Sequence, residues 1–275
     1  MAKRTSPILE LGRATGNVVV SVGEVTLFAI RLFNWMFTRR PWRSTIVPNM
    51  YQIGVLSVPV VAITGTFIGM VLAVQAYSQF KSLGLESRLG VVVNSSLVTE
   101  LGPVLAATML AGRIGGAMAA EIATMKVTEQ IDALRVLGAN PIHYLAVPRF
   151  IACVTLIPLL TIIADFMGII GGAIVSTQVL HIDAFHYWRH SRMSVGSWEI
   201  FCGLFKTFFF GAEIAIISCF RGFRSTGGAE GVGQSATAAF VHSFVAILAS
   251  DFFLGMFLNG VYEMLWPNYR SSLIG

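Results

Sequence analysis

STIVPNMYQIGVLSVPVVAITGTFIGMVLAVQAYSQF, residues 44–80, contains no Asp, Glu, Lys or Arg. A transmembrane helix needs roughly 20 predominantly apolar residues, so this stretch can cross a bilayer with residues to spare. The whole chain follows the same trend, because its 275 residues are 55% hydrophobic and only 12% charged. A soluble domain usually carries about 25% charged residues. The sequence therefore predicts a membrane protein.

Similar apolar stretches predict an all-α polytopic membrane protein with about five transmembrane helices. The expected spans cover roughly residues 50–78, 92–118, 147–180, 199–221 and 235–263. The third is long enough to suggest either a tilted helix or a re-entrant piece. No internal repeat or low-complexity linker divides the chain, so residues 1–275 are expected to form one domain. Within it, residues 1–43 form an N-terminal region and residues 44–275 the transmembrane bundle.

The N-terminal region contains a helix with a narrow polar stripe over residues 16–38. Its polar side chains recur at steps of three, four or seven: Asn17, Ser21, Glu24, Arg31, Asn34 and Thr38. Apolar residues occupy much of the remaining surface, so this amphipathic helix is expected to lie in the membrane interface. Arg39, Arg40, Trp42 and Arg43 surround Pro41 and are typical of an anchor at the head-group boundary.

The basic residues between the spans predict the orientation. With a cytoplasmic N-terminus, twelve Lys and Arg lie inside and five lie outside. The twelve are Lys3, Arg4, Arg13, Arg31, Arg39, Arg40, Arg43, Lys126, Arg135, Arg149, Arg221 and Arg224, and the five are Lys81, Arg88, Arg189, Arg192 and Arg270. Cytoplasmic loops carry an excess of Lys and Arg, so the N-terminus is expected inside and the C-terminus outside.

Small residues mark where helices are expected to touch. Three GxxxG pairs occur in the first, second and third spans: Gly65 with Gly69, Gly112 with Gly116, and Gly168 with Gly172. Such pairs allow the close backbone approach on which helix association in lipid depends. They predict a tightly packed bundle and leave a dimer open.

Six ionisable residues fall inside the expected spans: Glu100, Arg113, Asp165, Lys206, Glu213 and Asp251. Each costs about 2.5–3.5 kcal/mol at a helix centre, so each is expected to face protein or water and to have a partner. Structural pairing within the bundle is one interpretation of all six. Glu100 differs because it precedes Gly102 and Pro103, a step expected to break the helix locally beside a cavity.

Several kinds of chemistry find no support in the chain. No Lys follows a Gly, so a Walker A loop is absent and no ATP site is expected here. His186 and His190 have the spacing of two zinc ligands on a helix, but Tyr187 stands where a zincin has Glu, so no metal site is expected. No nucleophile–base pair is evident, so an enzyme is not expected. The formal net charge of +5 is expected to be balanced by anionic lipid head groups rather than by nucleic acid.

Residues 124–148 predict a short amphipathic helix between the second and third spans. Thr128 is expected to cap it, with Glu129 and Asp132 in its first turns where the helix dipole favours acids. Apolar residues give one face, and Gly138 and Pro141 end the helix after about three turns. Such a helix either rests on the membrane surface or docks into a partner.

The same segment carries a family resemblance. Asp132-Ala133-Leu134 with Gly138 resembles the acidic-Ala-Ala…Gly motif of ABC importer permeases. The stretch TELGPVLAATMLAGRIGGAMAAEIATMKVTEQIDALRVLGANPIHYLAVPRF (Thr99–Phe150) resembles the core signature of the MlaE-type permease family, which works with MCE-domain lipid carriers. A second signature of that family is similar to GGAEGVGQSATAAFVHSFVAILASDFF (Gly227–Phe253).

The resemblance implies a homodimer of permeases in a bacterial inner membrane, with two cytoplasmic ATPase subunits that use ATP and a periplasmic MCE-domain protein. Transport of phospholipid or a related lipid to or from that carrier would support outer-membrane lipid homeostasis. The cytoplasmic coupling helix would be residues 129–138, with Glu129, Asp132, Ala133, Arg135 and Gly138. The lipid pocket would include Leu72, Ala76, Gln79, Phe80 and Glu100. Some members have Arg before the equivalent Glu, whereas Thr99 stands here.

Two other classes of function remain as alternatives. An ion-coupled secondary transporter would use Glu100, Asp165, Glu213 and Asp251 as proton sites, but such proteins usually contain inverted repeats, and none is visible. A non-transporting membrane scaffold would leave the intramembrane charges without a role.

Overall fold

The computed structural model describes residues 7–38 and 43–265, and these residues contain helices and no strand. Six helical segments within them are long and apolar enough to cross a membrane. The predicted all-α polytopic membrane protein is confirmed.

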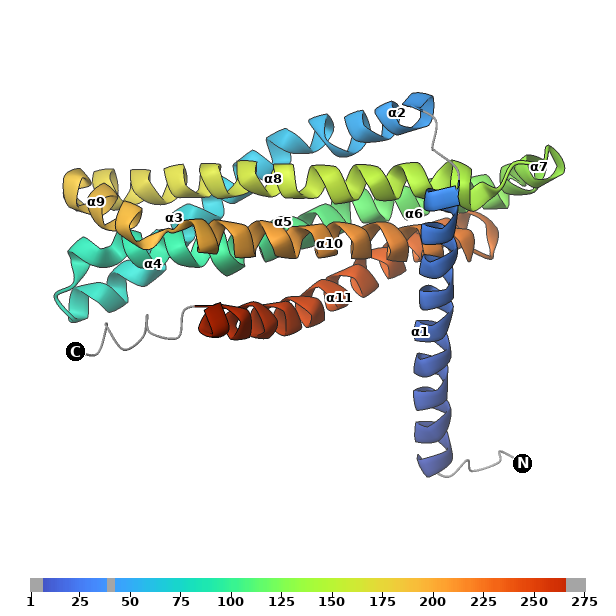
Figure 1. Cartoon of the computed structure of the whole chain (residues 1–275), viewed down its shortest axis with the longest axis horizontal. Helices are drawn as coiled ribbons and strands as arrows, with labels where there is room; N and C mark the ends of the chain where they lie inside the picture. Colours follow the sequence, from blue (N-terminus) through green and yellow to red (C-terminus); the bar gives the residue numbers. More distant parts are fainter. Residues whose placement is uncertain (1–6, 39–42, 266–275) are drawn as a thin grey trace.

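Five of the six segments run broadly along the long axis of the molecule, with α11 oblique to the others (Figure 1). They are α2 (Arg43–Ile53), η1 (Val55–Ser57) and α3 (Val58–Ser82); α4 (Leu89–Ser96), η3 (Leu97–Leu101), α5 (Gly102–Leu110), η4 (Ala111–Gly115) and α6 (Gly116–Val127); η5 (Ile142–Ala146), α8 (Val147–Ile174) and η6 (Val175–Val179); α10 (Ser197–Phe223); and α11 (Gly228–Leu265). Each expected span overlaps one of these segments. The third is helical from Ile142 to Val179 without a break, so the re-entrant piece is ruled out.

The remaining long helix, α1 (Pro7–Thr38), runs across the other five instead of along them (Figure 1). Phe28 and Leu32 bury one side of it against the bundle, and the ring of Phe28 lies 5.9 Å from that of Phe220. Apolar side chains such as Leu27 and Ile30 stay exposed on α1. This arrangement is compatible with an interfacial helix, but Val19–Thr38 is also apolar enough to cross a membrane, so the interfacial position stays a prediction. Of the expected basic-aromatic anchor, residues 39–42 lie outside the described residues, and Arg43 begins α2.

The bundle has two distinct ends (Figure 1). At one end, here named the α7 end, lie α1, the short helix α7 (Gln130–Val136) and the connection from α10 to α11. At the other, the α9 end, lie the single turn η2 (Glu86–Arg88) and α9 (Ala184–Ser194).

Helix α9 is fixed to the bundle by a buried polar cluster. The Tyr187 side chain is fully buried and its hydroxyl donates to Oδ1 of Asn94 at 3.4 Å. The amide of Asn94 in turn donates to the hydroxyl of Ser191 at 2.5 Å. Burial raises the pKa of the Tyr187 phenol, and the hydrogen bond with Asn94 opposes that rise. Because buried polar groups are costly without partners, these bonds specify how α9 sits on α4.

Two of the three GxxxG pairs pack against each other within the chain. A Cβ atom added to Gly69 would lie 1.8 Å from the carbonyl oxygen of Gly168, and one added to Gly65 would lie 2.5 Å from that of Ala164. Helices α3 and α8 therefore touch backbone to backbone, as small residues at this spacing allow in membranes. The second pair lies near α11 instead, with Gly112 facing the ring of Phe240.

Four π turns lie within the described spans, namely η3, η4, η5 and η6. Such turns are rare in proteins overall, and many of those that occur lie at functional sites. The helix continues through Gly102 and Pro103, so the predicted break is wrong. The amide of Gly102 donates to the carbonyl of Leu97, five residues earlier, and the wide turn accommodates a proline that lacks an N–H group.

Candidate functional site

The π turn η3 places the carboxylate of Glu100 beside α10. On the neighbouring helix, Gly203 packs against the carbonyl of Val98, which a Cβ atom at position 203 would approach to 2.1 Å. This close approach brings Lys206, one helical turn further along α10, to the level of Glu100. The glycine and the wide turn together set the distance between the two charged side chains.

Lys206 joins two acids from different helices. Its Nζ lies 2.5 Å from Oε2 of Glu100 and 3.1 Å from Oδ1 of Asp251 on α11. The contact with Glu100 is a hydrogen bond, whereas the geometry of the contact with Asp251 is that of an ion pair only. The sequence predicts a partner for Lys206 without identifying it, and the structure shows two partners on other helices.

The three groups differ in how far they reach the surface. Lys206 is 1% exposed, Asp251 is 21% exposed and Glu100 is 50% exposed. The cation is thus enclosed behind the acids, and a carboxylate faces outward. Removing a charge from water is expensive unless it is paired and hydrogen-bonded, and this arrangement supplies Lys206 with both kinds of partner.

A cavity of about 670 Å³ opens at this charged group. Glu100 and Asp251 line it together with α11 residues: Phe252, Gly255, Met256, Asn259, Gly260 and Glu263. A Cβ atom at Gly255 would lie 3.5 Å from Nζ of Lys206, so this glycine leaves the acids accessible from the cavity. The α11 residues were missed in the sequence, although the steps of four from Asp251 to Gly255 and Asn259 place them on one helix face.

The other expected intramembrane charges are placed separately. Glu213 accepts a hydrogen bond from the hydroxyl of Ser250 at 3.0 Å. Asp165 packs against Gly102, where a Cβ atom would lie 1.8 Å from its Oδ1. The guanidinium of Arg113 donates to the hydroxyl of Ser57. The expected partners are thus found for Glu213 and Arg113, whereas Oδ1 of Asp165 has no hydrogen-bond partner among the described residues.

The predicted lipid-contacting residues of α3 lie elsewhere than the cavity at Glu100. Leu72, Ala76 and Phe80 are partly buried and pack against an apolar cluster near the α9 end, and Gln79 is exposed. Of the five predicted pocket residues, Glu100 alone lines this cavity. Contact between the other four and lipid stays a prediction.

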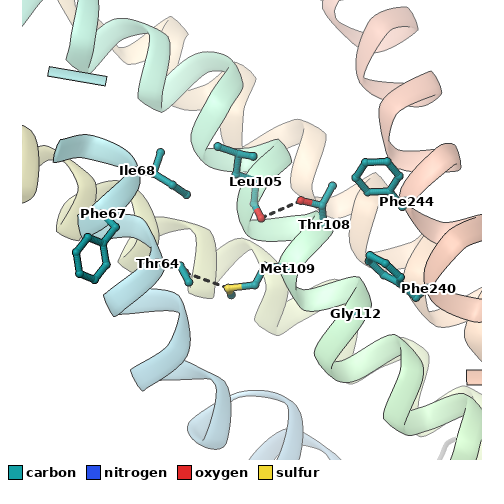
Figure 2. Close-up of a pocket in the computed structure, with 9 residues that line it drawn as sticks. All are labelled: Thr64, Phe67, Ile68, Leu105, Thr108, Met109, Gly112, Phe240 and Phe244. Carbon is teal, nitrogen blue, oxygen red and sulfur yellow. Dashed lines mark hydrogen bonds between the residues drawn. The ribbon is translucent and has the colours of Figure 1, made fainter. Parts of the chain in front are cut away.

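A second, apolar cavity of about 560 Å³ lies between α3, α5 and α11 (Figure 2). Figure 2 shows Thr64, Phe67 and Ile68 on one side and Phe240 and Phe244 on the other. The hydroxyl of Thr64 donates to the sulfur of Met109 at 3.0 Å, so few polar groups remain to face the cavity. Its lining is suited to hydrocarbon rather than to a polar solute.

The short helix predicted between the second and third spans is present but starts later than expected, and its role in coupling stays a prediction. The Thr128 hydroxyl donates to the carbonyl of Thr124 at the end of α6, so Thr128 does not cap α7. Glu129 precedes α7 in a left-handed conformation, with φ of 58°, and α7 has 7 residues, or about two turns. Gly138 ends it with φ of +77°, and the amides of Gly138 and Ala139 close a Schellman motif.

The surface of α7 is polar on one side and apolar at its end. Asp132 and Arg135 form an exposed ion pair at 2.8 Å. Ile131 is buried against the bundle, whereas Val136 and Leu137 are 89% and 80% exposed. An exposed pair contributes about 0–1 kcal/mol to stability, so folding alone gives little reason for these charges. The exposed end of the helix offers apolar contacts to another molecule.

The histidines of α9 show no additional ligand. The rings of His186 and His190 stack with centroids 6.2 Å apart. No group of three potential ligands that could hold a metal ion occurs in residues 7–38 and 43–265.

The helices and the charged cavity between them define a multi-pass, all-α membrane protein. A family model described as permease MlaE matches residues 46–257, so the chain belongs to the MlaE permease family. It is 41% identical over 244 residues to a probable ABC transporter permease protein of Rickettsia felis, covering 89% of this chain and 94% of that protein. The family resemblance of the two signature stretches is confirmed.

Two further relatives agree with this assignment. A probable ABC transporter permease protein of Synechocystis sp. is 43% identical over 212 residues, covering 77% of this chain and 81% of that protein. The intermembrane phospholipid transport system permease protein MlaE of Haemophilus influenzae is 36% identical over 216 residues, covering 78% and 83%.

Proposed function

We propose that this chain is the permease subunit of an ABC transporter that moves phospholipid, or a related lipid, between a bacterial inner membrane and an MCE-domain carrier. The observation that carries the proposal is the cavity at Glu100, where a charged group is kept at membrane depth beside an opening of about 670 Å³. Intramembrane charges commonly mark substrate pathways. Membership of the permease family and the name of the Haemophilus relative support lipid as the substrate.

In this proposal the α7 end faces the cytoplasm and the α9 end faces the periplasm. The C-terminus is then periplasmic, α1 lies in the cytoplasmic interface, and transport supports the lipid homeostasis of the outer membrane. Two copies of the chain enclose the transported lipid, whose acyl chains also meet Leu72, Ala76, Gln79 and Phe80.

Energy enters this chain through α7, because the chemistry of ATP belongs to a separate ATPase subunit. Asp132, Arg135 and the exposed apolar end at Val136 and Leu137 contact that subunit. Motion of α7 passes to α10 through α6, since Lys126 donates to the carbonyl of Phe223 at 2.6 Å. The transporter must therefore have two states that bind lipid with different affinities.

The test is purification of the chain from its native membrane in mild detergent, followed by reconstitution of the recovered complex. An ATPase with a Walker A motif should copurify, and labelled phospholipid should reach the MCE-domain acceptor only with hydrolysable ATP. Transfer driven by a proton gradient without ATP would favour the ion-coupled alternative. Recovery without an ATPase, and without transfer under either condition, would favour a scaffold.

A further inference from the structure

A polar pocket distinct from the cavity at Glu100 lies between α2 and the α5–α6 helix. Its volume is about 170 Å³, and its polar lining consists of Asn49, Gln52, Arg113 and Glu121. Asn49 and Gln52 lie one turn apart on α2, and Arg113 and Glu121 lie two turns apart on the facing helix. Gln52 and the neighbouring Ala117 are exposed, so the pocket opens at the side of the chain.

Arg113 is the cation of this pocket and has no ion pair among the described residues. One of its amino groups donates to the hydroxyl of Ser57, which donates its own proton to the carbonyl of Ile53 at 2.5 Å. The serine therefore holds the guanidinium in place but does not neutralise it. Arg carries five N–H donors, and most of them are left for another acceptor.

Among the described residues that line this pocket, the one acid is paired with a different cation. Oε2 of Glu121 lies 2.9 Å from the guanidinium of Arg149, whose side chain is 5% exposed. Eight residues separate Glu121 from Arg113, a rise of about 12 Å along a helix. The pocket thus contains a positive charge that the surrounding residues do not balance.

The pocket also lies at a suitable depth for a lipid head group. Phe150, next to Arg149, packs against Phe33 of α1 with ring centroids 5.2 Å apart, so the Glu121 side of the pocket is level with α1. Arg113 lies about two turns deeper towards the middle of the bundle. If α1 marks the membrane surface, as proposed above, the pocket runs from the head-group region into the acyl region of the same leaflet.

We propose that this pocket binds the phosphate of a phospholipid from the leaflet that contacts α1. The phosphate accepts charge-assisted hydrogen bonds from Arg113, and Gln52 supplies a further polar contact at the opening. The amide of Asn49 already donates to the carbonyl of Thr45 at 2.6 Å. The chain then has two lipid sites, one at Glu100 and one at Arg113, in opposite halves of the bundle. The inference rests on the proposed position of α1 and does not depend on the direction of transport.

The test uses the full complex in nanodiscs, with a photo-crosslinking residue in place of Ala117 beside the pocket. Two probes with identical alkyne-tagged acyl chains are compared, a phosphatidylglycerol and a glucosyl diacylglycerol that lacks phosphate. We expect at least about tenfold more capture of the phospholipid, which corresponds to about 1.4 kcal/mol. Equal capture of the two probes by the otherwise unchanged protein overturns the proposal, whether or not any Arg113 variant folds.

Variants and a competitor sharpen this result. Arg113→Gln should lower phospholipid capture to the level of the glycolipid, Arg113→Lys should retain part of it, and Arg88→Gln at the α9 end should leave it unchanged. Unaltered capture in a folded Arg113→Gln protein contradicts the proposal. Loss of capture in excess inorganic phosphate assigns the site to free phosphate, and overturns the assignment to lipid.

A crosslinker at Met256, beside the Glu100 cavity, separates this inference from the proposed function. If lipid is captured at Met256, but the phospholipid and the glycolipid are captured equally at Ala117, the inference at Arg113 fails alone. If ATP-dependent transfer also fails, the proposed lipid transport is wrong.

Discussion

The ammonium group of Lys206 lies 2.5 Å from the carboxylate of Glu100 and is almost completely enclosed, while half of Glu100 remains exposed. The cation therefore stabilises the charge of the acid from the buried side and does not itself face the cavity. Any ligand that enters meets the carboxylate first.

This relationship predicts that Lys206 matters chiefly for stability. Lys206→Met leaves the two acids without their shared cation. Breaking a fully buried pair costs about 3–5 kcal/mol, and the exposure of Glu100 places the expected loss below that range. We expect a lower unfolding temperature in detergent, measured by fluorescence-detected size exclusion. The triple variant Lys206→Met, Glu100→Gln, Asp251→Asn should recover much of the loss. A single variant as stable as the original protein would show that the ion pairs contribute little.

Gly255 predicts a separate effect on ligand access. Gly255→Leu places a large side chain beside Lys206 and Glu100, where a Cβ atom already lies 3.5 Å from Nζ. We expect normal expression and at least about fivefold less phospholipid retained in native mass spectra, a difference of about 1 kcal/mol. Gly233→Leu on the same helix is the control, because no atom lies within 4 Å of its added Cβ. Equal lipid retention by the two variants would remove the cavity at Glu100 as a binding site.

The contact between α3 and α8 predicts a strong dependence on a single methyl group. Gly69→Ala forces its Cβ against the carbonyl of Gly168, and overpacking of this kind typically costs about 1–3 kcal/mol. Gly260→Ala has free space around its Cβ and should be tolerated. Thermal unfolding of the two purified variants checks the difference. The close approach is unimportant if they unfold at the same temperature.

Charge reversal on α7 predicts loss of the ATPase. Glu129→Lys with Asp132→Lys should leave membrane insertion intact, because both side chains are exposed. Removing one partner of a desolvated charge pair at an interface costs about 2–5 kcal/mol, which weakens a complex about 30-fold or more. Copurification should reveal permease without ATPase and without transfer activity. Glu86→Lys at the opposite end is the control, and a double variant that keeps its ATPase would exclude α7 as the coupling element.

The two ends of the bundle predict a labelling pattern. Cys153, Cys202 and Cys219 are buried, so a membrane-impermeant maleimide should react mainly with an introduced cysteine. Ala133→Cys on α7 should react only in inverted vesicles, and Arg189→Cys on α9 should react in intact spheroplasts. Reaction of both positions from one side would contradict the five-span arrangement.

The sequence predicts the long elements of this fold well, because a run of apolar residues identifies a spanning helix almost independently of its neighbours. It also predicts that charges such as Lys206 have partners. It does not identify the partners, since Glu100 and Asp251 lie on helices distant in sequence and their approach depends on the packing of Gly203. The predicted start of α7 was wrong because the hydroxyl of Thr128 donates to the carbonyl of Thr124 in the preceding turn instead of capping α7. Local propensity allows Thr to make either bond.

The GxxxG pairs show a related difficulty. The motif indicates that a helix makes a close contact, but it does not identify the partner helix. For Gly65 and Gly69, a partner in a second copy of the chain is as consistent with the sequence as a partner in the same chain. The structure assigns both residues to the packing of α3 on α8. The surface through which two copies would meet is therefore to be sought elsewhere, and α11, with few buried residues in its span, is the most open of the five.

The π turns are places where a spanning helix of this protein can gain or lose a single residue. Deleting one residue from an α-helix rotates everything beyond it by about 100° and so turns its apolar face away from its neighbours. A π turn already holds one residue more than an α-helical turn, so a deletion within residues 97–101 or 175–179 restores regular geometry and keeps both flanking faces in register. Insertions and deletions of single residues inside these spans are therefore expected at the wide turns, where a helix can lose a residue without losing its orientation.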